Sequence, residues 1–377
     1  LHEPLSRSEA LIEADRCYFC FDAPCTTACP TDIDIPGFIQ KIRSDNIPGS
    51  AHTILKENIM GGMCARVCPT EVLCEEACVR NTHEEQPVRI GLLQRYATDP
   101  VLRSGKPPFS RQPSSGKRVA VVGGGPAGLS CAHRLSMLGH DVVVFNRDNK
   151  PGGLNEYGIA AYKTIENFAQ SEVEFILAIG GIDIRNRQAL GREFTLDDLR
   201  SEYDAVFLGF GLGGVNELGI DGEKLDGVLN AVDYIAELRQ AQDLSKLTVG
   251  RRIVVIGGGM TAIDIAVQSR RLGADEVSLV YRRGPEQMGA SRYEQELAMT
   301  NGVLIHHFAM PVKILGDDHV SGVEFETTEI GKDGQLKGTG QRFDVDADVV
   351  FKAVGQVAVD DILGDRLQDF DRKRGKL

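Results

Sequence analysis

The chain has 377 residues and a formal net charge of −12 at pH 7, a length that predicts two or three domains. Because a nucleic-acid-binding surface needs clustered Lys and Arg, this acidic balance argues against nucleic acid as a partner. Residues 1–16 are too charged for a signal peptide, and no apolar run is long enough to span a bilayer. We therefore expect a cytoplasmic protein.

Cysteines dominate the first part of the chain, where eight of the nine fall within residues 17–78. In a reducing compartment such crowding indicates metal binding or redox chemistry rather than disulfides. The two blocks are Cys17, Cys20, Cys25 and Cys29, followed by Pro30, and Cys64, Cys68, Cys74 and Cys78, with Pro69 after Cys68. Cys-Pro endings and spacings of this kind are typical of 4Fe-4S clusters. The alternative is a pair of zinc sites, but only Cys17 and Cys20 have the two-residue spacing typical of zinc.

Composition changes at residues 104–117, a stretch rich in Pro, Ser and Gly that predicts a linker. Before it, short amphipathic stretches predict a helical domain. After it, apolar strands alternate with helical patterns, which predicts an α/β fold with a parallel sheet.

One internal repeat stands out in this second part. The run RVAVVGGGPAG at residues 118–128 and the run RIVVIGGGMTA at residues 252–262 are the same strand, glycine loop and helix opening. The expected helices are Leu129–Leu138 and Ile263–Leu272, and the expected second strands are Asp141–Phe145 and Glu276–Tyr281. Two such units predict two nucleotides, a flavin and a pyridine nucleotide.

The first loop carries the dinucleotide pattern and is followed by a second glycine loop suited to a flavin dinucleotide. Its candidate binding residues are Gly123, Gly124, Gly125, Pro126, Ala127 and Gly128, joined by Gly152, Gly153 and Leu154. Asn146 stands where an acidic residue would hold a ribose hydroxyl, and its amide can also bond a hydroxyl.

The second loop predicts the pyridine-nucleotide site. Its candidate residues are Gly257, Gly258, Gly259, Met260, Thr261 and Ala262. Arg282 and Arg283 end the following strand, where arginine can accommodate a 2′-phosphate, which favours NADPH. Two solvated arginines and NADH remain the alternative.

The cysteine blocks together with GGGPAGL, PGGLNEYGI, GGGMTAID and YRRGPEQM resemble the glutamate synthase small-subunit family. Its relatives include the NAD(P)-binding half of dihydropyrimidine dehydrogenase and the separate bacterial electron-input subunit. The resemblance covers nearly the whole chain. It implies a helical domain with two 4Fe-4S clusters, then an FAD domain interrupted by an NAD(P)H domain.

The implied boundaries are 1–103 for the cluster domain, 104–117 for the linker, 118–229 for the first part of the FAD domain, 230–344 for the NAD(P)H domain and 345–377 for the return to the FAD domain. Relatives continue beyond the position of Leu377, and the chain lacks an initiator Met, so we expect a fragment that holds FAD weakly.

The segment IGLLQRY at residues 90–96 resembles the dihydropyrimidine branch, in which a glutamine replaces one thiolate. The resemblance thus implies Cys17, Cys20, Cys25 and Cys78 for one cluster, and Cys29, Cys68, Cys74 and Gln94 for the other. In the alternative, Cys64 closes the second site and Gln94 is a surface residue. The resemblance also places Lys163, Gly211, Leu212, Ala353, Val354 and Gly355 near the flavin.

These features predict a relay in which FAD links hydride transfer from NAD(P)H to one-electron centres. No catalytic acid or base is assigned. Pyrimidine reduction in this family uses an FMN-bearing barrel of about 250 residues, for which no chain remains, so we expect an FMN-containing partner subunit in a hetero-oligomer. The alternatives are a glutamate synthase small subunit with an amidotransferase partner, and a non-catalytic nucleotide sensor with structural clusters.

Overall fold

The computed structural model describes residues 3–359 and 361–370, which form two compact units. Unit 1 combines the chain up to Glu156 with Tyr162–Gly211 and the segment from Val359. Unit 2 combines Tyr157–Ala161 with Leu212–Ala358. Each unit is described below by itself.

The first part of unit 1 is helical, as predicted. Its elements are α1 (Arg7–Asp15), α2 (Pro24–Ala28), α3 (Ile35–Arg43), α4 (Ile47–Glu57), α5 (Gly61–Val67), η1 (Thr70–Val72), α6 (Val79–Glu84) and α7 (Ile90–Ser104). Polar side chains cap several of these helices: Asp34 and Asn46 accept hydrogen bonds from Gly37 and Gly49 at the starts of α3 and α4. Buried residues of α1, α3, α4 and α7, among them Phe38, form a core against which Cys17, Cys25 and Cys29 pack.

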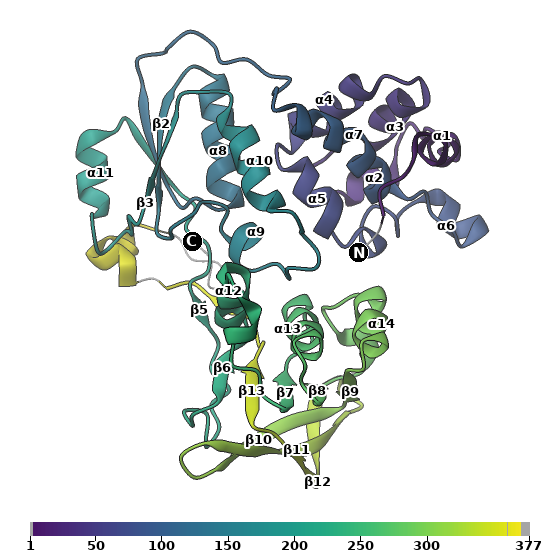
Figure 1. Cartoon of the computed structure of the whole chain (residues 1–377), viewed down its shortest axis with the longest axis vertical. Helices are drawn as coiled ribbons and strands as arrows, with labels where there is room; N and C mark the ends of the chain where they lie inside the picture. Colours follow the sequence, from purple (N-terminus) through teal and green to yellow (C-terminus); the bar gives the residue numbers. More distant parts are fainter. Residues whose placement is uncertain (1–2, 360, 371–377) are drawn as a thin grey trace. The chain divides into compact units, whose positions relative to one another are not determined.

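The second part of unit 1 is a parallel sheet with strand order β3-β2-β1-β4. Its elements are β1 (Arg118–Val122), α8 (Pro126–Met137), β2 (Asp141–Asn146), α9 (Leu154–Tyr157), α10 (Phe168–Leu177), β3 (Ile182–Asn186), α11 (Leu196–Glu202), β4 (Ala205–Leu208) and η4 (Asp361–Asp369). Figure 1 shows α8 and α10 along one face of this sheet. The two central strands, β1 and β2, are buried over nearly their whole length and are largely apolar, as expected for the centre of a helix-covered sheet.

The two parts of unit 1 share a hydrophobic core. Leu55 of α4 packs in one cluster with Leu129 of α8 and with Val173 and Ile176 of α10. Since these side chains leave water together, the helical part and the flavin-type fold pack on one another within unit 1.

Unit 2 has a parallel sheet of order β6-β13-β7-β8-β9, and an antiparallel sheet of order β10-β11-β12. Its elements are β5 (Gly214–Val215), β6 (Val228–Asn230), α12 (Ala231–Gln240), η2 (Leu244–Lys246), β7 (Arg252–Ile256), α13 (Met260–Arg271), β8 (Glu276–Tyr281), η3 (Pro285–Gln287), α14 (Arg292–Thr300), β9 (Leu304–His307), β10 (Ala309–Gly316), β11 (Val320–Ile330), β12 (Leu336–Asp346), β13 (Val349–Lys352) and β14 (Gln356–Val357). Val254, Val280 and Val350 of the parallel sheet share a core with Val323 and Phe325 of the antiparallel one. Figure 1 shows α12, α13 and α14 on the other side of the parallel sheet.

The α/β fold class with a helical first domain is thus confirmed, but unit 2 is longer than the predicted NAD(P)H domain. It runs from Leu212 to Ala358 rather than from 230 to 344. The cause is β13, which pairs with β7 and β6 in the middle of the unit 2 sheet. The two-stranded ladder of β5 and β14 extends the unit further at both ends. Within the residues that the structure describes, no helix combines the length and apolarity needed to cross a bilayer.

Candidate functional site

The first glycine loop joins β1 to α8 and leaves no room for side chains. A Cβ on Gly123, whose φ is +111°, would lie 2.3 Å from the Gly209 carbonyl oxygen. A Cβ on Gly128 would lie 1.8 Å from the Gly123 carbonyl oxygen, so glycine there lets α8 pack directly on the loop. In the described part of the chain, no side chain caps the first turn of α8, which begins with Pro126 and Ala127. Its free N–H groups suit a pyrophosphate.

The glycine loop at Gly152 and Gly153 lies directly against the first glycine loop, which joins β1 to α8. The Gly152 N–H donates to the Gly124 carbonyl oxygen at 2.7 Å, and a Cβ on Gly153 would lie 2.7 Å from the Gly125 Cα. Leu154 begins α9 with about half of its surface exposed. The structure therefore brings the two loops predicted for a flavin dinucleotide together into one cradle, and these residues fit such a group.

Asn146 ends β2 beside this cradle, where the sequence places a ribose-binding residue. Its side chain is buried, and Nδ2 donates to the carbonyl oxygens of Asp148 and Lys150 and to Asn186 Oδ1 at 2.8–2.9 Å. A Cβ on Gly124 would lie 2.7 Å from Asn146 Oδ1, so this oxygen faces the first loop. With its donors used inside the protein, Asn146 offers the ribose only an acceptor.

The remaining residues assigned to the flavin are spread over several places. Lys163 lies in unit 1 with Nζ 5.9 Å from the centre of the Tyr162 ring. Gly211 ends a unit 1 segment with φ +72°. Leu212 belongs to unit 2, where its carbonyl oxygen accepts a hydrogen bond from Gln356.

The second glycine loop of the repeat, between β7 and α13, opens onto a cavity of about 710 Å³ within unit 2. Gly257, Gly258, Gly259 and Thr261 line it, together with Tyr281, Arg282, Lys352, Ala353, Val354 and Gly355. No heavy atom lies within 4 Å of the Cβ position of Gly259, so the backbone there is open to a ligand. Met260 is partly exposed and Ala262 is buried on α13. The size and the open glycine loop fit a dinucleotide.

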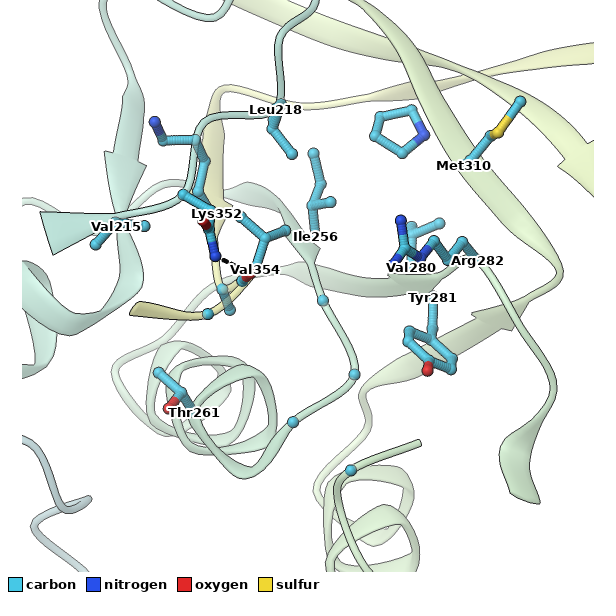
Figure 2. Close-up of a pocket in the computed structure, with 18 of the residues that line it drawn as sticks. Val215, Leu218, Ile256, Thr261, Val280, Tyr281, Arg282, Met310, Lys352 and Val354 are labelled. Atoms are coloured by element: carbon cyan, nitrogen blue, oxygen red, sulfur yellow. Dashed lines mark hydrogen bonds between the residues drawn. The ribbon is translucent and has the colours of Figure 1, made fainter. Parts of the chain in front are cut away.

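The two arginines at the end of β8 differ in position. Arg282 lines the cavity, and Figure 2 shows it with Tyr281 on the side opposite Lys352 and Val354. Arg283 is not part of the lining. Ala353, Val354 and Gly355 also line this cavity. Their position beside the flavin, which the resemblance implies, stays a prediction.

An ion pair in the cavity wall was missed by the sequence reasoning. Lys352 Nζ lies 2.9 Å from Glu223 Oε1, and both side chains are largely buried. Burial alone would raise the pKa of Glu223, but the N–H groups of Leu218 and Gly219 and the Lys352 ammonium outweigh it and lower that pKa. The pair links residues 129 positions apart, so no local sequence pattern could indicate it.

The cysteines of the two blocks converge in unit 1. The pKa values of Cys17 and Cys25 are raised chiefly by burial. Cys20 and Cys78 raise that of Cys17 further, and Cys17 and Cys78 raise that of Cys25. Those of Cys68 and Cys74 are raised with contributions from Cys29 and Cys64. The Cys64 thiol shares a hydrogen bond with Cys68, which lowers the pKa of Cys64 and raises that of Cys68. We call Cys17, Cys20, Cys25 and Cys78 the first thiol group and Cys29, Cys64, Cys68 and Cys74 the second; the two are neighbours, because Cys25 also raises the pKa of Cys74. Each group draws on both blocks, which fits two clusters.

The spacing of the potential metal ligands bears on the zinc alternative. Among the described residues, no three His, Cys, Asp or Glu side chains converge closely enough to hold one metal ion. A cluster of four irons holds its sulfur ligands farther apart than one ion does, so the ligand set of each cluster remains a proposal.

Gln94 and Cys64, the two candidates for closing the second cluster, are neighbours. Gln94 of α7 is buried, with Nε2 donating to the Gly61 carbonyl oxygen at 2.8 Å. A hydrogen bond from Gln94 also helps to lower the pKa of Cys64. Gln94 is therefore not a surface residue, and both side chains lie at the second thiol group.

Two glycine-loop nucleotide folds joined to two thiol groups define an iron–sulfur flavoprotein that uses a pyridine nucleotide. Residues 1–106 match the family model described as dihydropyrimidine dehydrogenase domain II, 4Fe-4S cluster. Residues 117–376 match the model described as pyridine nucleotide-disulphide oxidoreductase. The chain belongs to this oxidoreductase family and, within it, to the group that contains glutamate synthase small chains and PreT subunits.

Two curated relatives represent that group. The glutamate synthase (NADPH) small chain of Escherichia coli K12 is 36% identical over 373 residues, which cover 94% of this chain and 78% of that protein. The NAD-dependent dihydropyrimidine dehydrogenase subunit PreT of the same organism is 34% identical over 349 residues, which cover 93% and 80%. The predicted family is confirmed, and the chain is an NAD(P)H-dependent oxidoreductase with FAD and 4Fe-4S clusters.

A solved structure agrees on the fold. Mycobacterium tuberculosis FprA in complex with NADPH has a TM-score of 0.54 and 23% sequence identity, over 66% of this chain and 72% of that one. At this identity the likeness concerns the fold alone.

Proposed function

We propose that this chain is the electron-input subunit of a dihydropyrimidine dehydrogenase. It takes electrons from NAD(P)H and delivers them to a separate FMN-containing subunit that reduces uracil or thymine. The supporting observation is Gln94, whose buried side chain lies beside Cys64 with Nε2 fixed by the Gly61 carbonyl oxygen at 2.8 Å. That hydrogen bond leaves Oε1 as the atom that can bind iron, as the resemblance to the dihydropyrimidine branch implies.

The residues of unit 1 have defined roles in this proposal. The first turn of α8 and the paired glycine loops hold the pyrophosphate of FAD, and Asn146 Oδ1 accepts from its ribose. Cys17, Cys20, Cys25 and Cys78 bind one cluster, and Cys29, Cys68, Cys74 and Gln94 bind the other. Cys74 and Cys78 are buried and the other thiols are partly buried, so the surrounding protein limits access of water and tunes the clusters.

In unit 2, the first turn of α13 holds the pyrophosphate of NAD(P)H, and Arg282 pairs with a 2′-phosphate. When bound, FAD would supply the change from two-electron to one-electron transfer, because a flavin accepts two electrons from a nicotinamide and releases them singly.

A second candidate is the small subunit of a glutamate synthase, favoured by the 36% identity to the Escherichia coli chain. The two candidates differ in the partner that they require. The first requires an FMN-containing subunit, and the second a large amidotransferase subunit.

Anaerobic affinity purification of the full-length protein from its native cell tests the proposal, with the partner identified by mass and by flavin content. We expect an FMN-containing protein of barrel size in a fixed ratio to this chain. Recovery of a large amidotransferase subunit would establish the second candidate instead. Recovery of this chain alone would contradict both subunit assignments.

A further inference from the structure

The start of α5, the helix that carries Cys64 and ends at Cys68, is capped by a residue from a distant helix. The first N–H groups of a helix have no partner within the helix, and no side chain of the α5 N-cap residue, Met60, supplies one. Glu172 does, because its Oε1 accepts a hydrogen bond from the Met63 N–H at 2.9 Å across 109 residues. The Gly62 N–H also bonds this carboxyl group.

Glu172 is an unusual residue for its surroundings. It lies on α10 of the flavin-type fold with 2% of its surface exposed, next to Val173 of the shared core. Burial raises the pKa of Glu172 to about 8. A carboxyl group in such a place is costly unless it is hydrogen-bonded, and the partners that it has are the N–H groups at the start of α5.

A second contact fixes α5 from the same helix. The Arg66 guanidinium lies over the Phe168 ring, 3.5 Å from its centre. Arg66 also pairs with Asp99 at 2.9 Å, and both of these side chains are nearly buried. Cation–π contacts are strongest when they are desolvated in this way.

Glycine makes the close approach of the two helices possible. A Cβ on Gly62 would lie 2.3 Å from Leu102 Cδ1, 2.8 Å from Phe168 Cζ and 2.9 Å from Glu172 Oε1. Figure 1 shows α5 beside α10, in agreement with these contacts. Three independent features therefore hold the helix of Cys64 and Cys68 on the fold that carries the first glycine loop.

We propose that Glu172 is a positioning residue that, together with Phe168, locks α5 onto α10 and thereby sets the potential and the reduction rate of the cluster beside Cys64. The proposal rests on the family's FAD and clusters and not on the identity of the partner subunit. The rate of electron transfer between two centres falls steeply as the distance between them grows. A helix that holds cluster ligands must therefore be fixed relative to the flavin fold. Hydrogen bonds around the ligands also tune a cluster's potential.

The test uses the full-length protein with its clusters and FAD, at pH 7. Glu172→Leu removes the acceptor at similar volume, and Glu172→Gln keeps an acceptor oxygen. Glu174→Gln, at an exposed position on the same helix, is the matched control. Stopped-flow absorbance separates flavin reduction by NAD(P)H from cluster reduction, an EPR-monitored titration gives the cluster potentials, and a chelator measures the rate of iron release.

For Glu172→Leu we expect flavin reduction like that of the parent, slower cluster reduction and a shifted cluster potential. Iron release should accelerate by about tenfold or more, because the variant leaves the buried Met63 and Gly62 N–H groups without their acceptor. Glu172→Gln should behave like the parent on all readouts. If Glu172→Leu does not fold, Phe168→Leu, which leaves no buried polar group unpaired, should shift the same readouts in the same direction.

The proposal is overturned if these leucine variants match Glu174→Gln in cluster potential and cluster reduction. It is also overturned if flavin reduction slows as much as cluster reduction, because that would mean general damage. Neither result depends on which partner the purification recovers.

Discussion

Arg282 is the cavity residue with the sharpest expected effect on cofactor choice. It lines the unit 2 cavity, whereas the adjacent Arg283 does not. Because a charge-assisted bond to a 2′-phosphate contributes about 1.5 kcal/mol, Arg282→Ala should raise KM for NADPH about tenfold and leave kcat unchanged. Steady-state reduction of an artificial acceptor with NADPH and NADH measures the effect.

Arg283→Ala is the control for this prediction and should change neither constant. KM for NADH should be the same in both variants, since NADH lacks the 2′-phosphate. An equal rise in KM for NADH, or a larger rise in the Arg283 variant, would mean that Arg282 does not bind the 2′-phosphate.

His133 predicts a pH dependence of stability. It is a buried residue of α8 whose ring contacts Phe109, and burial, aided by Arg134, lowers the pKa of His133 from 6.5 to about 4. The unfolded chain therefore takes up a proton at higher pH than the folded one. Above pH 6.5 the full stability is present, and it is lost as pH falls from there towards 4.

Urea unfolding followed by circular dichroism at pH 7 and pH 5 measures this loss. His133→Gln should reduce the difference in unfolding free energy between the two pH values by about 1 kcal/mol. His140→Gln, after the end of the same helix, should leave it unchanged. An unaltered difference in His133→Gln would show that another group dominates the acid sensitivity.

At the scale of single residues, the roles of the glycine loops and cysteines could be predicted, because their chemistry depends on residue type and spacing. The partners of a side chain could not. Asn146 was predicted to bond a ribose hydroxyl, a role that remains a prediction, but nothing local indicated that its Nδ2 would be used by Asp148, Lys150 and Asn186. Glu172 and Lys352 look like ordinary charged residues in the sequence, and only the fold gives them buried partners.

Among the elements, the repeated strand, loop and helix units were predicted most accurately. Strand β8 has the expected bounds, and α8 and α13 start three residues before the expected helices, at Pro126 and Met260. The difference arises because the last residues of each glycine loop already form the first helical turn, where proline is well tolerated.

The position of β13 in its sheet could not be predicted from the sequence. Its run Val349–Lys352 is short and largely apolar, and such a strand fits equally well in either sheet. Its partners are β6 and β7, about 120 and 100 residues earlier. Such pairing depends on long-range contacts, which periodicity alone does not encode.

At the scale of the molecule, the extent of unit 2 predicts which fragment folds alone. A chain from Leu212 to Ala358 contains all strands of its parallel sheet, including β13, which lies between β6 and β7. We expect it to melt cooperatively and to bind NADPH, as measured by circular dichroism and by the fluorescence of the nucleotide. The fragment 212–344, with the predicted end of the domain, lacks β13 and should do neither. Equal behaviour of the two fragments would contradict the boundary.

The ladder of β5 and β14 has a consequence for how such a chain can arise. Gly214 lies opposite Val357, so the segment that enters unit 2 and the segment that leaves it run side by side. An inserted domain whose ends are adjacent replaces a surface turn of its host, and the entropy of closing that turn rises only slowly with the length inserted. A gene segment for a nucleotide-binding domain can therefore enter the turn after β4 without altering the strand order β3-β2-β1-β4 of unit 1.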